Sequence, residues 1–271
     1  MPTNPPRDPH GLLGPDDPPP FELLNPEGTA PLLLICDHAS RAVPAVLEGL
    51  GLPESALAEH IGWDIGAAAV TRRLSRALNA PAVLCGYSRL VIDCNRLPGD
   101  PTSIPAVSDC LPVPGNQDLT ELAQEARTDA VFVPYHQAID EALAHLWRRL
   151  PGTAPALVSI HSFTPCMRDG APRPWHAALL WNRDPRLVVP MLQALRAEDG
   201  LVIGDNEPYD GRQVNYTLDR HAGAAGLPHV AVEIRQDLIA DDTGADAWAE
   251  RLGVALDGLL GAPHIHAVRH F

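Results

Sequence analysis

The sequence predicts an α/β fold, a three-layer α/β/α sandwich with helices on both faces of a mainly parallel mixed sheet. Short apolar runs alternate along the chain with longer amphipathic stretches, which is typical of folds built from strand–helix units. With 271 residues, 45% of them hydrophobic, the chain can bury one substantial core. Polar residues directly follow two of the apolar runs, at the sheet edge where α/β proteins place their sites.

Charge and hydropathy exclude several classes of function. The formal net charge of −14 argues against a nucleic-acid partner, because phosphate binding needs basic patches. No apolar run approaches the roughly 20 residues of a membrane span, and the first residues lack the apolar core of a secretory signal. We therefore expect a cytoplasmic protein with a small-molecule partner, without membrane binding, as a monomer or small homo-oligomer.

The cysteines predict no disulfide framework and no cysteine-based zinc site. None of the spacings matches a CxxC pair or a zinc finger, and three of the five lie in or beside apolar runs. We expect all of them to be reduced and mostly structural. Cys166, close to His161 in the sequence, is the only one considered as a nucleophile.

The two ends of the chain differ from its centre. Residues 1–28 are rich in proline without a periodic apolar pattern, so we expect an extended arm without packed elements. A single domain should follow over residues 29–262. Residues 263–271 carry histidines and are expected to form a tail on the surface.

In the first half of the domain, apolar β-branched runs predict strands and one-sided apolar patterns predict helices. The expected strands cover residues 31–36, 82–85 and 90–94, and the expected helices cover 53–59 and 63–78. Asp64 stands near the start of the second helix, where an acidic side chain also caps a helix. The proline- and glycine-rich stretch 97–116 has the length of a functional loop, and we expect it to border the site.

The second half continues the alternation of strands and helices. A long helical pattern comes first, and its proline predicts a break near residues 133–135. The expected helices cover 119–150, 185–197, 216–225 and 243–260, and the expected strands cover 156–160, 176–181 and 228–235. Residues 204–209 read as a polar loop.

Two of the predicted strands lead into a histidine, which suggests a metal held at the rim of the sheet. These residues are His38 and His161. A hydrolytic zinc site takes three ligands from histidine and carboxylate side chains and leaves a fourth position to water. Asp64 is the preferred third ligand and Asp37 is the alternative. A plain helix N-cap is the competing interpretation of Asp64.

One glutamate lies inside an apolar strand, where a carboxylate must be paired or functional to offset its burial. This residue, Glu233, is the candidate general base. The alternative is a buried salt bridge with Arg235 or Arg89. Alternation along the strand puts residues 233 and 235 on one face, which is compatible with both interpretations.

Arginines near the predicted sheet edge suggest an anionic substrate. Arg89 precedes one apolar run, and Asn95 and Arg96 follow it. Arginine binds carboxylates through two hydrogen bonds, and an adjacent amide can complete the contact. The alternative is that these arginines only pair with some of the 34 acidic residues.

Several short motifs together resemble the N-formylglutamate amidohydrolase family of zinc-dependent deformylases. Each motif is weak alone, but they occur in family order from about residue 30 to 250. They are Cys36-Asp-His-Ala-Ser40, His60-Ile-Gly-Trp-Asp64, Ser88-Arg-Leu-Val-Ile-Asp-Cys-Asn-Arg96, Pro134-Tyr-His136, Ser159-Ile-His-Ser-Phe-Thr-Pro165, Tyr216 to Ala222 and Val232-Glu-Ile-Arg-Gln236.

The resemblance implies a phosphorylase/hydrolase-like α/β/α fold, shared with zinc carboxypeptidases and aspartoacylases, and one zinc ion per chain. In those relatives an Asn-Arg pair holds a substrate carboxylate, an earlier arginine polarises the scissile carbonyl and a late glutamate is the base. Asn95-Arg96, Arg89 and Glu233 stand in the equivalent order. The carboxypeptidase pattern has a glutamate three residues after the first histidine, where this chain has Arg41.

The expected function is a metal-dependent amidohydrolase that cleaves a linear amide, such as the N-formyl group of an N-formyl amino acid. We expect substrate contacts also from Ser162, from Thr102 and Ser103 in the long loop, and from His221. A carboxypeptidase or N-acyl-amino-acid hydrolase on the same scaffold is the alternative enzyme. A non-catalytic small-acid binding protein is the alternative from another class.

Overall fold

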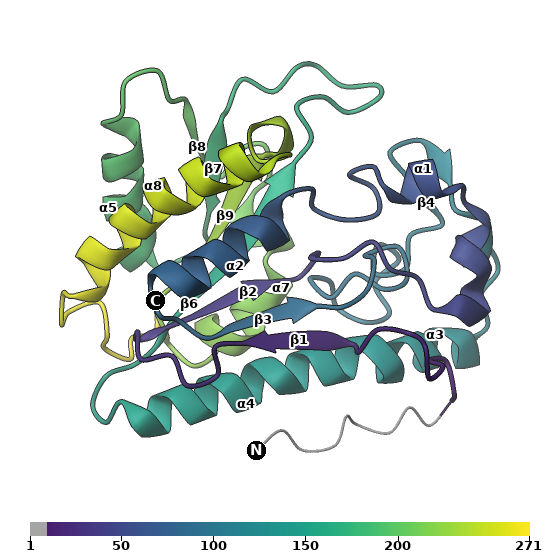
Figure 1. Ribbon diagram of the computed structural model, residues 1–271, viewed down its shortest axis with the longest axis horizontal. Coiled ribbons are helices and arrows are strands. Elements are labelled where there is room, and N and C mark those ends of the chain that lie inside the picture. The colour runs from purple at the N-terminus through teal and green to yellow at the C-terminus, as the bar shows by residue number, and fades with distance from the viewer. Residues whose placement is uncertain (1–9) are drawn as a thin grey trace.

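Helices cover both faces of one seven-stranded sheet in the computed structural model, which describes residues 10–271 (Figure 1). The strands are β1 (Phe21–Leu24), β2 (Leu32–Cys36), β3 (Ala82–Cys85), β6 (Ala156–Phe163), β7 (Ala177–Leu180), β8 (Ile203–Asp205) and β9 (His229–Arg235). They lie in the order β1-β3-β2-β6-β9-β7-β8. The four central strands are parallel, whereas β1 and β7 are antiparallel to β3 and β9. The predicted mainly parallel mixed sheet is confirmed.

The α-helices of the described chain are α1 (Glu54–Leu57), α2 (Ala67–Ala77), α3 (Glu121–Arg127), α4 (Val133–Arg149), α5 (Pro185–Arg196), α6 (Gly211–Val214), α7 (Tyr216–Leu218) and α8 (Asp242–Leu260). The longer ones, α2, α4, α5 and α8, form the two outer layers. In Figure 1, α4 runs along one side of the sheet, while α2, α5 and α8 lie on the other. Within β2, Leu33 and Ile35 pack into the core under α4, whereas Leu32 and Leu34 pack under α2 and α8. Full burial on both faces explains why this strand is a continuous apolar run.

The order of the central strands brings distant segments of the chain together. Strands β2 and β6 are parallel neighbours, and β9 pairs with the other side of β6. His161 lies opposite Glu233 in the β6–β9 register. Strand β6 extends to Phe163, so His161 lies within the strand rather than in the loop expected after residue 160.

The predicted strand at residues 90–94 is wrong. This segment is fully buried but irregular. Its carbonyl groups accept hydrogen bonds from side chains, which takes the place of a neighbouring strand. The carbonyls of residues 90, 91 and 94 accept from Asn116, Arg127 and His136 at 2.8, 3.1 and 2.9 Å. The burial was therefore predicted correctly, and the backbone conformation was not.

The two ends of the described chain are packed more closely than expected. Strand β1 adds an antiparallel edge to the sheet, within the arm expected to lack packed elements; residues 1–9 of that arm lie outside the described residues. In the tail, Ile265 and His266 are buried, and His266 exchanges hydrogen bonds with Ala154. The division of the chain at residues 28 and 262 stays a prediction.

The connecting segments contain more structure than the sequence indicated. The loop 97–116 carries a short hairpin of β4 (Val107–Ser108) and β5 (Leu111–Pro112), followed by the 3₁₀ turn η2 (Pro114–Asn116). The expected break in helix 119–150 is a π-helical turn, η3 (Thr128–Phe132), after which Pro134 occupies the first turn of α4. A second π-helical turn, η4 (Asp219–Gly223), continues α7, and two further 3₁₀ turns are η1 (Ala45–Gly51) and η5 (Gln236–Leu238). Across residues 10–271 the structure contains no helix with the length and apolarity to cross a membrane.

Candidate active site

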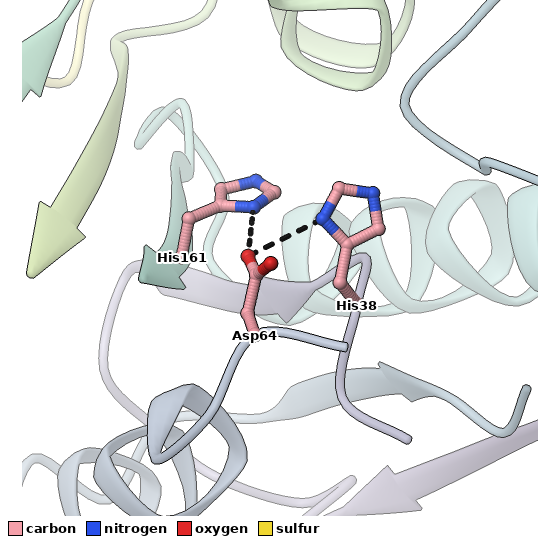
Figure 2. A group of neighbouring side chains, drawn as sticks. All are labelled: His38, Asp64 and His161. Atoms are coloured by element: carbon pink, nitrogen blue, oxygen red, sulfur yellow. Dashed lines mark hydrogen bonds and ion pairs between the residues drawn. The ribbon is translucent and has the colours of Figure 1, made fainter. Parts of the chain in front are cut away.

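Three side chains from separate segments converge at the carboxyl ends of β2 and β6 (Figure 2). The Asp64 carboxylate lies 2.8 Å from His161 Nδ1 and 3.3 Å from His38 Nδ1. All three side chains are buried, and their ligand atoms lie within 4.8 Å of one another. The backbone N–H of Asp64 donates to the carbonyl of His38 at 3.0 Å, which fixes the two loops against each other. The three residues expected to bind metal therefore form one cluster.

Each histidine is held on its other ring nitrogen by a second buried carboxylate. His38 Nε2 lies 2.8 Å from Asp93, and His161 Nε2 lies 3.1 Å from Asp37. Asp37 also accepts hydrogen bonds from Ser159, Tyr135 and Thr217. Metal-binding histidines commonly have such a carboxylate behind them, because it fixes the ring orientation and raises ligand basicity.

The positions of Asp64 and Asp37 distinguish their roles. Asp64 is not the N-cap of α2, because Gly66 occupies that position in a left-handed conformation without a side-chain cap. Its carboxylate faces both Nδ1 atoms, whereas Asp37 faces only the far nitrogen of His161. Ser162 supports Asp64 from the strand, since its N–H donates to the Asp64 carboxylate at 3.2 Å and its hydroxyl donates to Ile65. This geometry favours Asp64 over Asp37 as the third ligand.

The electrostatics of the cluster show how strongly these groups depend on one another. Burial would raise the pKa of Asp37, but the hydrogen bond and the charge of His161 hold it at about 2. Burial would likewise lower the pKa of His161, but hydrogen bonds to Asp37 and Asp64 raise it well above its usual value. Burial would also raise the pKa of Asp64, but the charges and hydrogen bonds of His38 and His161 hold it well below its usual range.

The donor set fits a divalent metal ion. Two imidazole nitrogens and one carboxylate are the ligand types of hydrolytic zinc sites. Both Nδ1 atoms face one buried carboxylate oxygen, at 3.3 Å from His38 and 2.8 Å from His161. A divalent cation at this point would meet two imidazole nitrogens and one carboxylate oxygen, and Asp37 and Asp93 would still orient the rings.

Glu233 lies beside this cluster, opposite His161 in the β6–β9 register. Its side chain is buried, 7% exposed, and its Oε2 atom makes no hydrogen bond in the described part of the chain. The expected alternatives are not formed within residues 10–271, since Arg235 pairs with Asp237 and Arg89 pairs with Asp64 and Asp93. Burial raises the pKa of Glu233 to about 7, although the nearby charge of His161 opposes this shift. A carboxylate with such a pKa suits proton transfer near neutral pH.

The two arginines expected to contact a substrate differ in their surroundings. Arg89 donates to Asp93 at 2.8 Å and lies 3.5 Å from Asp64, and its side chain is 30% exposed. It therefore reaches the cluster from the solvent side. Arg96 is half-buried, and its positive charge helps to lower the pKa of Asp93, which burial alone would raise. Within residues 10–271 the guanidinium of Arg96 forms no ion pair, so it can receive an external anion.

The remaining expected substrate contacts are occupied by structural hydrogen bonds. Asn95 donates to the Val214 carbonyl and accepts from the Thr217 N–H, both at 3.0 Å. Thr102 and Ser103 form a turn closed by Asp100, in which their hydroxyls donate to Asp100 oxygens. The Ser103 carbonyl accepts from the Asp93 N–H at 2.7 Å, so the long loop does reach the site. Their binding roles stay predictions.

His221 lies away from any open surface. Its side chain is 1% exposed, and both ring nitrogens have partners, His136 and Asp140. The structure therefore argues against direct contact between His221 and a substrate. Cys166 is exposed in a loop, where its thiol points at backbone carbonyls.

Two residues near the site, Asp93 and Tyr209, were not predicted from the sequence. Asp93 orients His38, and an acidic residue within the apolar run 90–94 carries the same signal that identified Glu233. Burial, and then the charge of Glu233, raise the pKa of Tyr209. Its hydroxyl accepts from Arg173 at 3.1 Å, and the Arg173 guanidinium lies 5.0 Å from its ring centre. No local pattern distinguishes this tyrosine in the polar loop 204–209.

In the metal-free protein, Glu233→Gln should become more stabilising as pH rises. The folded-state pKa of about 7 exceeds the ordinary value of 4.5, so Glu233 contributes stability below about pH 4.5 that is lost as pH rises through 7. Glutamine does not titrate. The free energy of unfolding of the Glu233→Gln variant, relative to that of the parent protein, should therefore rise by about 2 kcal/mol between pH 5 and pH 8. Urea denaturation after chelation measures this, with Glu250→Gln on the exposed face of α8 as the control. A loss of stability at pH 8 would instead indicate a missing ion-pair partner.

Comparisons with known proteins identify the family of this chain. The family model described as N-formylglutamate amidohydrolase matches residues 30–240. A crystal structure of gene product Atu2144 from Agrobacterium tumefaciens shares 36% identity and a TM-score of 0.87, covering 92% of this chain and 98% of that one. The crystal structure of N-formylglutamate amidohydrolase from Ralstonia eutropha JMP134 shares 21% identity and a TM-score of 0.72, and the match covers 90% of this chain and 98% of that one. No curated protein matches the sequence significantly. With more than half of its length matched by the family model, the chain belongs to the N-formylglutamate amidohydrolase family.

Proposed function

We propose that this protein is a zinc-dependent amidohydrolase that removes the formyl group from a small N-formyl amino acid such as N-formylglutamate. Membership of an amidohydrolase family supports hydrolysis of an amide. The observation that carries the proposal is the buried Glu233, whose Oε2 atom has no hydrogen-bond partner among residues 10–271, beside a cluster of two histidines and one carboxylate. A base placed next to a metal-ligand set is what amide hydrolysis requires.

In the proposed site, His38, His161 and Asp64 hold one zinc ion per chain. Bound zinc would polarise the substrate carbonyl and lower the pKa of a water molecule. Glu233 accepts a proton from the attacking water and returns it to the leaving amine, since a carboxylate with a pKa near 7 can do both. Arg89, which reaches the cluster from the solvent side, hydrogen-bonds the oxygen that becomes negative.

The substrate's carboxylate is assigned to Arg96. Its guanidinium forms no ion pair within residues 10–271, and it follows Asn95 at the edge of the site. Asn95 holds the loop at residues 214–217, and its amide can still offer one more N–H to a ligand. A small anionic N-acyl amino acid would then span Arg96 and the metal cluster. A cytoplasmic location and a monomeric or small homo-oligomeric state complete the proposal.

Two other functions are compatible with the same scaffold. A carboxypeptidase or N-acyl-amino-acid hydrolase would use the same ligands and base with a different acyl pocket. A non-catalytic binding protein has no need for Glu233, because an unpaired buried carboxylate costs stability. A screen of zinc-loaded protein on N-formyl, N-acetyl and N-carbamoyl amino acids and on dipeptides separates the enzymes. We expect the highest kcat/KM on an N-formyl amino acid, and absence of hydrolysis on every class would contradict the proposal.

Glu233→Gln should lower kcat by roughly 10² to 10⁴-fold, because the variant keeps the shape but loses the proton acceptor. Zinc content and KM should change little, since Glu233 is not among the proposed ligands. Steady-state kinetics and elemental analysis on the same sample measure both. The exposed Glu250→Gln should behave like the parent. A zinc-loaded Glu233→Gln protein with normal kcat would remove Glu233 from the mechanism.

Arg96→Lys should raise KM for an N-formyl amino acid sharply while leaving kcat closer to the parent value. Lysine keeps the charge but cannot form two parallel hydrogen bonds to a carboxylate. The parent enzyme should also hydrolyse the corresponding neutral amide poorly. Arg76→Lys, at an exposed position on α2, is the matched control. Equal kcat/KM of the parent for the acid and its amide would show that no carboxylate is recognised.

A further inference from the structure

The polar loop at residues 204–209 folds tightly against the strand that pairs with the strand of Glu233. A Cβ atom on Gly204 would lie only 3.0 Å from the Cβ atom of Ala178, so glycine permits this close approach. Ala178 lies opposite Glu233 in the β7–β9 register, which places both side chains on one face of the sheet. The Asn206 side chain closes the loop by accepting from the first backbone N–H after β7 at 2.9 Å. The loop that ends at residue 209 is therefore fixed next to the candidate base.

Arg173 holds the Tyr209 side chain from the neighbouring loop. Its guanidinium donates to the Tyr209 hydroxyl and to the Thr164 carbonyl, both at 3.1 Å. The same guanidinium lies 5.0 Å from the ring centre of Tyr209 and 5.8 Å from that of Phe163. Phe163 follows His161 by two residues in β6, so these two side chains share one face, about 7 Å apart along the strand. Arg173 and Tyr209 therefore lie at the end of the strand that carries a metal-ligand candidate.

The Tyr209 hydroxyl has a proton to donate. An arginine can only donate a hydrogen bond, so the hydroxyl accepts from Arg173 and its own proton points elsewhere. Within residues 10–271 no group accepts that proton. Burial, and then the charge of Glu233, raise the pKa of Tyr209, so the phenol stays protonated at neutral pH. Accepting from a cation also makes the hydroxyl a stronger donor, because neighbouring hydrogen bonds polarise one another.

Tyr209 and Arg89 approach the proposed reaction centre from two sides. Arg89 lies 3.5 Å from Asp64, on the side of β2, whereas Tyr209 follows β8. In the sheet order, β6 and β9 lie between β2 and β8, and they carry His161 and Glu233. A substrate oxygen placed at these two central strands can therefore meet one hydrogen-bond donor from each side.

We propose that Tyr209 is a further catalytic residue, whose hydroxyl donates a hydrogen bond to the acyl oxygen of the substrate as that oxygen becomes negative. Arg173 is the positioning residue that holds and polarises this hydroxyl. The inference rests on the proposed amidohydrolase function. Tyr209 keeps its proton throughout, and the proton transfer stays with Glu233. Such a donor stabilises the tetrahedral intermediate more than the substrate, because the oxygen carries its full negative charge only in the intermediate.

Tyr209→Phe should lower kcat on an N-formyl amino acid by roughly 10²-fold, which is typical for the loss of one oxyanion donor. KM should change little, because the contact forms with the charged oxygen rather than with the bound substrate. Steady-state kinetics of the zinc-loaded, full-length protein measure both. Tyr216→Phe is the matched control, since the Tyr216 hydroxyl also accepts from an arginine, Arg220, at 3.1 Å but at an exposed position. An unchanged kcat of Tyr209→Phe, or a rise in KM alone, would overturn the inference.

The role of Arg173 is tested by combining the two substitutions. Arg173→Gln should lower kcat by roughly tenfold in the parent, because it removes the charged hydrogen bond that fixes the donor. In the Tyr209→Phe background the same substitution should change kcat by less than roughly threefold, since the group that it positions is gone. Arg212→Gln, whose side chain is 65% exposed, removes an equal charge nearby and should match the parent. Equal losses of kcat in both backgrounds would show that Arg173 acts independently of Tyr209.

A binding measurement does not depend on turnover. In a phosphonamidate analogue of an N-formyl amino acid, a tetrahedral phosphorus with charged oxygens replaces the formyl carbon. Calorimetry on zinc-loaded protein should show that Tyr209→Phe weakens binding of this analogue by roughly 10²-fold while the product amino acid binds as to the parent. Equal affinity of Tyr209→Phe and the parent for the analogue would refute the oxyanion contact even in an active enzyme. A parent that hydrolyses no N-formyl amino acid but shows this loss of affinity would refute the proposed function and leave the contact standing.

Discussion

The carboxylate of Asp64 between two imidazoles is the interaction on which the rest of the site depends. It joins the loop after β2, the loop before α2 and the strand β6 at one buried point. A charged side chain buried this deeply would reduce the stability of the fold by several kcal/mol if it were unpaired. Each of the three has a further partner: Asp93 for His38, Asp37 for His161 and the Ser162 N–H for Asp64. The cluster is therefore rigid before any ligand arrives, which is what a metal site requires.

This buried polar network also explains the irregular core beneath α4. Asp37 takes hydrogen bonds from Tyr135 on α4 and from Thr217 on α7, so both helices are tied to the end of β2. The segment at residues 90–94 crosses the same region without a strand partner, and side chains rather than a sheet satisfy its backbone. Strands β6 and β9 contribute His161 and Glu233, and the loop after β2 contributes His38 and Asp37. The segment beneath α4 contributes Asp93, which orients His38.

The sequence predicted the parts of this structure that depend on local pattern. The buried strands at β2, β6 and β9, the histidines at the ends of two of them, and the acidic residue within the third could all be found from apolar runs interrupted by a charge. The run 90–94 failed as a strand because its partners, Asn116, Arg127 and His136, lie 26, 36 and 42 residues further along the chain than the carbonyls they bind. The burial of His221 was missed for the same reason, since only the fold brings it against α4. Asp64 was found through its motif, and its separation from the helix cap became evident only from the position of Gly66.

In the proposed site, His38, His161 and Asp64 hold one zinc ion beside Glu233. Anomalous diffraction from crystals of the zinc-loaded protein, collected on both sides of the zinc absorption edge, would locate this ion. We predict a single strong peak per chain, about 2.0 to 2.2 Å from both Nδ1 atoms and from an Asp64 oxygen. Absence of a peak at this cluster, or ordered zinc only elsewhere on the chain, would contradict it.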